Sequence, residues 1–401
     1  MVNNHHSRKK GVAVASTLLA LIAASCGSSA KTAAPTTAAA TTTAAAAAAT
    51  TAPAATTASA ATTAPAGTTA SAGTTAGAGT TASGGTAAAA GAGIKKGLTV
   101  YFIPKDTQNP YEVLADGGGT AALTELGGKV VVSSGTEDTA AAQIPSIQAA
   151  IQAKADAIVI AGNDPDALCP SLAQAQAAGI KVVAFDSDVS CPDHLFINQA
   201  NTEQIGTSEV DLLAKEINST GEIAILSAAA TATNQNAWIG FMKQQLSKYP
   251  NMKLVDTVYG NDDPATSLTV LQGLLSAHPN LKGIISPTTV GISTAAQYFS
   301  THKDVKVTLT GLGLPSQMKP YIKDGTVTAF ELWNPKDLGY LAGYAAAALA
   351  SGVYTLTDGA KFTGGKLGPY TLSLPAGSKE ATVVLGPPQV FDASNIDQFN
   401  F

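Results

Sequence analysis

Short apolar runs rich in valine and isoleucine alternate with longer alanine-rich stretches through most of the chain. The clearest example lies between Asp156 and Asp188, where the apolar runs 156–160 and 181–185 flank an alanine- and glutamine-rich stretch at 168–178. An unbroken apolar run predicts a strand that is buried on both faces, and the stretch between the runs, which ends at a glycine, predicts a helix. The pattern therefore predicts a strand–helix–strand unit whose second strand delivers an aspartate at its carboxyl end.

The same alternation recurs on both sides of this unit. Further strands are expected at 98–103, 129–132, 195–197, 221–226, 253–259, 281–285, 305–309 and 326–332. Strands that alternate with helices indicate α/β domains with parallel sheets and right-handed crossovers. Two similar runs, 98–197 and 222–309, predict two doubly wound lobes with a cleft between them, and the segment after residue 351 is expected to be hairpin-like and irregular.

Polar side chains follow the expected strands, and Asp186 and Asp188 come directly after the strand at 181–185. Ligands of parallel α/β sheets bind outside the carboxyl ends of the strands. A turn cap explains one such aspartate equally well, but the recurrence along the chain favours a binding site for a polyhydroxylated neutral ligand. The candidates are Lys105, Asp186, Asp188, Asn198, Gln199, Asn234, Gln235, Thr289 and Asn334, with Trp333 and Phe102 as flat apolar surfaces for a sugar-like ring.

Residues 1–26 have the pattern of an export signal. A basic front precedes the apolar stretch 11–24, which is too short to span a bilayer, and small residues lead to Cys26. This order resembles a bacterial lipoprotein signal peptide, in which Cys26 is lipidated after cleavage, and an ordinary cleaved signal peptide is the alternative. Either form predicts export to the periplasm or cell surface, and the first predicts a lipid anchor in the membrane.

Residues 27–96 are a low-complexity segment of alanine, threonine, proline, serine and glycine, without a charge between Lys31 and Lys95. Such a composition buries too little apolar surface to offset the entropy of ordering, so a disordered tether is expected. A short helix at the alanine run 44–49 is the alternative for that stretch. The repeated threonine pairs are candidate acceptors of O-glycans.

The part that follows is too long for one core to keep growing, so two domains are expected. We expect a first lobe at 97–200 plus 335–355 and a second lobe at 201–334 plus 356–401. This division implies a hinge that allows closure by small rotations. Its three crossings are expected near 199–201, 333–335 and 353–356.

Two cysteines remain besides Cys26, and both stand next to a proline. In an exported protein an even pair most often forms a disulfide. Cys169 begins an expected helix and Cys191 follows the next strand, so the two can lie close together. A zinc site would need more ligands than His194 supplies, and it is the lesser alternative.

Composition and motifs argue against several functional classes. The formal net charge of −5, from 23 basic and 28 acidic residues, gives no basic patch for nucleic acid. No GxSxG, HExxH or GxxxxGK[ST] motif is present, and we expect neither an enzyme nor a bound cofactor or metal. A repressor of this fold would need an N-terminal helix-turn-helix, and a purely structural surface protein would leave the polar strand ends unexplained.

Short motifs in the chain resemble those of the sugar-type periplasmic binding proteins of ABC importers. Within that family the chain is similar to the LsrB group, which are receptors for the quorum signal autoinducer-2, and to rhamnose-binding relatives. The resemblance covers 102–401 and implies two lobes around one ligand. Its motifs are FIPK at 102–105, DPDALCP at 164–170, FDSD at 185–188, INQ at 197–199, NQNAW at 234–238 and SNIDQFNF at 394–401.

The resemblance also implies a ligand set, position by position. Asn234 stands where the LsrB group has an aspartate, and Thr289 stands where it has an alanine. Both can still bond a polyol, since an amide offers a donor and an acceptor and threonine adds a hydroxyl. The positions that match are Lys105, Asp186, Gln235 and Pro287, and Trp333, Asp188 and Gln199 complete the predicted site.

The function implied by the resemblance is that of a monomeric extracytoplasmic solute-binding protein. It would pass a small furanose- or sugar-like ligand to the membrane permease of an ABC transporter. Autoinducer-2 is the favoured ligand. The alternatives are rhamnose or another monosaccharide, or a sugar-sensing receptor without transport.

Overall fold

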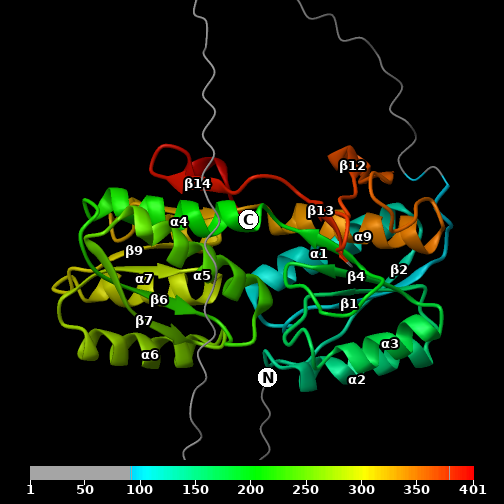
Figure 1. Ribbon diagram of the computed structural model, residues 1–401, viewed down its shortest axis with the longest axis horizontal. Coiled ribbons are helices and arrows are strands. Elements are labelled where there is room, and N and C mark those ends of the chain that lie inside the picture. Colours follow the sequence, from blue (N-terminus) through cyan, green and yellow to red (C-terminus); the bar gives the residue numbers. More distant parts are fainter. Residues whose placement is uncertain (1–90, 92, 379) are drawn as a thin grey trace, which may run out of the picture. The chain divides into compact units, whose positions relative to one another are not determined.

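A computed structural model describes residue 91 and residues 93–378 and 380–401 (Figure 1). The expected signal peptide, Cys26 and most of the expected tether lie outside the described residues. Among the helices that are described, none is both long enough and apolar enough to cross a membrane.

The first lobe is built on a six-stranded sheet in which all neighbouring strands run parallel. Two of its strands, β3 (Ala157–Ile160) and β5 (Leu195–Asn198), are buried along their whole length, as their unbroken apolar runs predict. Across the sheet, the strands are β13 (Ala381–Val384), β5 (Leu195–Asn198), β4 (Lys181–Phe185), β3 (Ala157–Ile160), β1 (Thr99–Ile103) and β2 (Lys129–Val132).

Helices cover both faces of this sheet, because successive apolar residues of a strand point to opposite sides. Val100 and Phe102 belong to the core beneath one pair of helices, and Tyr101 and Ile103 belong to the core beneath the other pair. The first pair is α1 (Pro110–Glu125) and α9 (Pro335–Ala350), and the second pair is α2 (Ala140–Gln152) and α3 (Cys169–Ala177).

The second lobe has a four-stranded parallel sheet, with β7 (Met252–Tyr259), β6 (Gly221–Ser227), β8 (Leu281–Ser286) and β9 (Thr308–Gly311) in that order. A parallel bridge from Leu312 to Glu331 leads to β10 (Ala329–Leu332), which pairs antiparallel with β14 (Gln389–Asp392). The expectation of two doubly wound α/β lobes is confirmed. The helices of this lobe are α4 (Thr202–Glu216), α5 (Thr233–Gln245), α6 (Pro264–Ala277), α7 (Thr289–Thr301) and α8 (Pro315–Lys323).

The chain crosses between the lobes three times. The first two crossings come after β5 and between β10 and α9. The third lies at 385–388 and not near 353–356, because β13 pairs with β5. Residues 356–384 therefore belong to the first lobe rather than the second. They include the hairpin of β11 (Lys361–Thr363) and β12 (Pro369–Thr371), and the four-residue β13 that follows is too short to be identified from its apolar pattern.

Helix α1 begins at Pro110, before the glycines in its interior. Pro110 stands at its first position and Asn109 caps it, a combination that favours a helix start. Gly118 and Gly119 lie inside the helix, where a Cβ at Gly118 would come within 1.9 Å of the backbone oxygen of Lys336 at the start of α9. The glycines thus allow α1 and α9 to touch, and this contact holds the second crossing beside the start of α1.

A disulfide joins Cys169, at the start of α3, to Cys191 in the loop after β4, with the Cα atoms 5.2 Å apart. The same loop carries Asp188, whose carboxylate lies 2.7 Å from Nε2 of His194. The other ring nitrogen of His194 lies 2.7 Å from the carbonyl oxygen of Cys191. His194 therefore fixes this loop, and the zinc alternative does not hold because both thiols are used.

Candidate functional site

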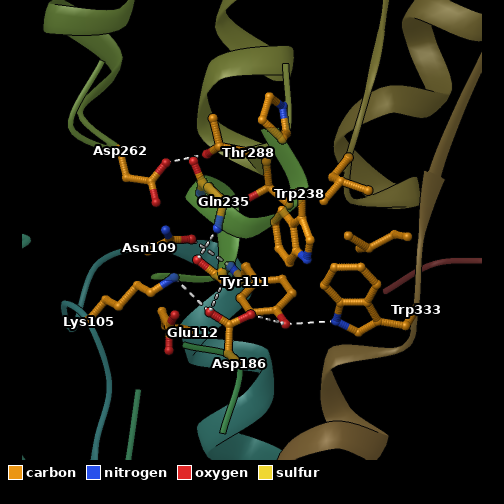
Figure 2. A pocket seen from close by; sticks show the side chains of 15 residues that line it. Lys105, Asn109, Tyr111, Glu112, Asp186, Gln235, Trp238, Asp262, Thr288 and Trp333 are labelled. Atoms are coloured by element: carbon orange, nitrogen blue, oxygen red, sulfur yellow. Dashed lines mark hydrogen bonds and ion pairs between the residues drawn. The ribbon is translucent and has the colours of Figure 1, made fainter. Parts of the chain in front are cut away.

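A small pocket lies between the lobes, beyond the carboxyl ends of β1, β4 and β8. Figure 2 shows side chains of both lobes pointing into it. This is the position at which parallel α/β sheets bind ligands. Its lining comprises Lys105, Asn109, Tyr111, Glu112, Asp186, Asn234, Gln235, Trp238, Asp262, Pro287, Thr288, Thr289, Leu312, Leu332 and Trp333.

A buried ion pair forms the first-lobe side of the pocket. Nζ of Lys105 lies 2.7 Å from Oδ2 of Asp186, and both side chains are almost fully buried. Burial opposes the charge of Lys105, but the surrounding carboxylates together, with Asp186 the strongest, outweigh it and raise the pKa of Lys105 above its usual value. Asp186 has a φ of 58°, so the chain turns sharply at the end of β4 and presents the carboxylate to the pocket.

Asp186 accepts hydrogen bonds from three different elements. Besides Lys105, the hydroxyl of Tyr111 donates to Oδ1 at 2.9 Å, and Nδ2 of Asn234 donates to Oδ2 at 3.1 Å (Figure 2). Asn234 belongs to the second lobe, so this bond closes the pocket from the other side. The hydroxyl of Thr231 adds a second bond between the lobes, to the carbonyl oxygen of Asn163 at 2.9 Å.

The polar groups on the second-lobe side of the pocket are mainly amides and hydroxyls. Oε1 of Gln235 accepts from the hydroxyl of Ser227 at 2.6 Å and from the backbone amide of Ala228 at 2.8 Å. These bonds fix the amide group, so its Nε2 remains as a donor for a ligand. The hydroxyl of Thr288 donates to Asp262, which is the one carboxylate on this side.

Two tryptophans form an apolar wall opposite the charged groups. Their rings meet edge to face, with the centroids of Trp238 and Trp333 5.9 Å apart. Nε1 of Trp333 donates to the hydroxyl of Tyr111 at 2.7 Å, and Tyr111 in turn donates to Asp186. With Leu312 and Leu332 beside the rings, one half of the pocket is apolar and the other half is hydrogen-bonding.

The ligand set predicted with the help of the family resemblance has nine residues, and seven of them line this pocket. The other two are Asp188 and Gln199. Asp188 turns away to His194, and the side chain of Gln199 is completely buried outside the pocket. Phe102 also lies in the core, against Phe185. The seven that line the pocket are Lys105, Asp186, Asn234, Gln235, Pro287, Thr289 and Trp333.

The sequence analysis missed the contribution of α1, which supplies Tyr111 and Glu112. An Asn-Pro pair after a strand end is a helix-start signal, and applying it at Asn109 would have placed both side chains beside Lys105. Trp238 was quoted within a motif without being assigned to the site, and its place one turn after Asn234 in α5 is the signal that was not used.

Glu112 is the least satisfied acid in the pocket. Its side chain is 1% exposed, and its Oε2 has no hydrogen-bond partner among the described residues. Burial, followed by the nearby Asp186 carboxylate, raises the pKa of Glu112 well above its usual value. Among the residues that the structure describes, no group of three histidine, cysteine, aspartate or glutamate side chains could hold a metal ion.

Comparisons with known proteins agree with this architecture. A solute-binding protein of an ABC transporter from Clostridium phytofermentas, solved with bound L-rhamnose, is 38% identical, with a TM-score of 0.73 over 76% of this chain and 98% of that one. A sugar ABC transporter protein from Actinomyces odontolyticus is 46% identical, with a TM-score of 0.60 over 76% and 98%. LsrB from Clostridium saccharobutylicum, in complex with AI-2, is 28% identical, with a TM-score of 0.70 over 76% and 100%.

The family assignment rests on the extent of the match as well as on the fold. A model described as periplasmic binding protein domain matches residues 100–353, which is more than half of the chain and includes strands of both lobes. The chain therefore belongs to the periplasmic binding protein family, with the two-lobed type I fold of the sugar-binding members.

Proposed function

We propose that this protein is the extracytoplasmic receptor of an ABC importer and that it captures a small neutral sugar carrying a methyl group. The observation that carries the proposal is the division of one interlobe pocket into a hydrogen-bonding half and an apolar half. Hydroxyls of the ligand pair with Lys105 on one lobe and Gln235 on the other. Its methyl group and ring C–H groups lie against Trp238 and Trp333.

L-Rhamnose, a 6-deoxyhexose, is the ligand that we propose first. It combines a set of ring hydroxyls with a methyl group, as the two halves of the pocket require. The rhamnose-bound relative is 38% identical to this chain, whereas the AI-2-bound relative is 28% identical. The preference therefore shifts from autoinducer-2, which the motifs alone favoured, to a deoxy sugar.

Autoinducer-2 is the second candidate, because the four positions that match the LsrB ligand set line the same pocket. The position that departs most in charge is Asn234, whose amide donates to Asp186 at 3.1 Å. An aspartate at this position would bring two carboxylates together, which is unfavourable unless a proton or a ligand donor separates them. The amide thus supports a ligand other than the one that LsrB-type sites hold.

We also propose that the receptor is a monomer that acts outside the cytoplasm, without catalysis or a cofactor. Lipidated Cys26 and the tether of residues 27–96 would hold it to the membrane. Its partner is then the permease of the importer. A sugar sensor without transport has the same pocket chemistry. Import of labelled sugar by cells, with and without the protein, separates the two.

The ligand proposal is tested by mass spectrometry of ligand released from the purified protein, followed by calorimetry with L-rhamnose, autoinducer-2 and D-ribose. We expect L-rhamnose to bind tightly, at about micromolar dissociation constant or below. Binding of autoinducer-2 alone would replace the first ligand by the second. Binding of none of the three, with no small molecule released, would contradict the receptor proposal.

A further inference from the structure

Glu112 is buried in the pocket without a protein partner, although Lys105 and Asp186 beside it are bonded to each other. Its Oε2 has no hydrogen bond, and no hydrogen bond of the described residues uses either of its carboxyl oxygens. A buried polar group without a partner destabilises the protein that carries it. Because Glu112 also lines the interlobe pocket, the partner that it lacks can be supplied by a ligand bound there.

A structural role as a helix cap is already filled by another residue. Asn109 and Glu112 have the spacing of a capping box, in which the glutamate accepts from the backbone amide of the cap residue. That amide, the N–H of Asn109, instead donates to Oδ1 of Asp106 at 2.7 Å. The side chain of Glu112 is left free, and Figure 2 shows it beside Lys105 and Asp186 in the pocket.

Asp186 has little capacity left for a ligand. An ionised carboxylate offers about four acceptor positions. Three are taken by protein donors, namely Lys105 at 2.7 Å, Tyr111 at 2.9 Å and Asn234 at 3.1 Å. Glu112 lines the same pocket and has none of its positions taken by a protein donor, so it is the acid that can accept several ligand hydroxyls.

We propose that Glu112 is the main acceptor for the hydroxyls of the bound sugar and selects neutral sugars that present adjacent hydroxyls to the start of α1. This inference rests on the proposed function and names the residue that deepens it. Lys105 and Asp186 then act mainly as a preorganised pair that holds Asn234 and closes the lobes. Glu112 is the group whose hydrogen bonds form only when the sugar is present.

The proposal has a consequence for stability that a structural role does not have. A residue that binds a ligand can destabilise the ligand-free protein. Replacing it with a neutral residue then raises stability and weakens binding. The variant Glu112→Gln keeps the shape of the side chain and removes the buried ionisable carboxyl group. The ligand-free variant should therefore melt at a higher temperature than the wild type, and it should bind sugar more weakly.

The control is Glu209→Gln. Glu209 lies in α4, is completely buried, and neither of its carboxyl oxygens has a partner among the described residues. It does not line the pocket. Glu209→Gln also removes a buried carboxyl group without a partner. It therefore shows how that removal alone changes the melting temperature, without any contact with the ligand.

The test uses the full mature protein, with melting curves of the ligand-free form and calorimetry with L-rhamnose, autoinducer-2 and D-ribose. For whichever sugar the wild type binds, Glu112→Gln should raise the dissociation constant about tenfold, because a hydrogen bond to an ionised acceptor is replaced by one to a neutral amide. Glu209→Gln should leave the dissociation constant unchanged, and both variants should melt at a higher temperature.

Two results would overturn the role of Glu112 while the receptor proposal stands. In the first, the wild type binds a sugar and Glu112→Gln binds it with the same dissociation constant. In the second, Glu112→Gln melts at a lower temperature than the wild type, whereas Glu209→Gln melts at a higher one. A wild type that binds none of the three sugars would contradict the proposed function and, with it, the inference.

Discussion

The two lobes contribute different chemistry to one pocket. The first lobe presents the charged groups Lys105, Asp186 and Glu112, whereas the second presents mainly amides and hydroxyls, such as Gln235 and Thr289. The charges of the ion pair balance within one lobe, and Asp262 is the acid that the second lobe brings toward the first-lobe carboxylates when the lobes close. The comparison teaches that the first lobe sets up the electrostatics of the site and the second lobe completes the hydrogen bonds.

The lobes also differ in how they are braced. The first lobe has the disulfide between Cys169 and Cys191, and the second lobe contains no cysteine. The disulfide lies beside the loop that follows Asp186, so it braces the charged half of the site from outside.

The largest expected effect concerns this brace. Replacing both Cys169 and Cys191 with serine should lower the free energy of unfolding by about 2–4 kcal/mol, because the unfolded chain regains the freedom of the closed loop. Chemical denaturation measures this change, and calorimetry should show the same ligand affinity as in the wild type. Two free thiols in protein purified without reductant would remove the basis of this prediction.

The next effect tests the charged half. Asp186→Ala leaves Lys105 buried without its partner and removes an acceptor for Asn234, so affinity for the ligand should fall roughly ten- to a hundredfold. The control is Asp188→Asn, two residues along in the same motif but outside the pocket. Calorimetry that finds an equal loss in both variants would mean that the loop, and not the pocket charge, controls binding.

A smaller effect tests the neutral half. Asn234→Asp converts a donor to Asp186 into a second carboxylate, so binding of L-rhamnose should weaken about tenfold. Asn236→Asp makes the same change at an exposed position of α5 and should have no such effect. If autoinducer-2 is the ligand, Asn234→Asp should preserve or strengthen binding, since it restores the residue usual in the LsrB group.

The smallest effect is a pH dependence of affinity. Burial and then Asp186 raise the pKa of Glu112 in the ligand-free protein, whereas Lys105 lowers it. Asp116 and Asp138 also raise it, and their own pKa values are raised to about 7 and about 8. Ligand hydroxyls that donate to Glu112 favour its ionised form. Binding should therefore release a proton, and affinity should rise with pH.

The expected rise is roughly two- to threefold per pH unit, since full release of one proton would give tenfold. Calorimetry in buffers of different ionisation enthalpy counts the protons released. The slope should be lost in Glu112→Gln, which keeps Asp116 and Asp138. Affinity that falls as pH rises would show that protonated Glu112 donates a hydrogen bond to the ligand and does not accept one from it.

The fold and part of the site could be predicted because both follow from strand ends. Unbroken apolar runs marked the buried strands, and residues directly after them, such as Asp186 and Pro287, entered the pocket. Asp188 and Gln199 also follow strands but point elsewhere. The direction of a side chain in a loop depends on partners such as His194, and strand periodicity carries no information about them.

The rest could not be read from apolar periodicity. Glycines inside α1 hid a helix start, since glycine is unfavourable in helix interiors and here allows contact with α9. The position of β13 depends on pairing with β5, which lies far away in the sequence. Glu112 was missed because the backbone amide that it would accept from as a helix cap, that of Asn109, bonds to Asp106 instead. Only the three-dimensional arrangement reveals this exchange of partners.

The central claim is that a sugar lies between a charged lobe and a mainly neutral lobe and is held by both. A crystal structure of the protein with its ligand tests this most directly. The account predicts ligand hydroxyls within hydrogen-bond distance of Glu112 and Lys105 on one side and of Gln235 and Asn234 on the other, with the apolar face of the ligand against Trp238. A ligand that contacts only one lobe, or that leaves Glu112 without a bond, would contradict it.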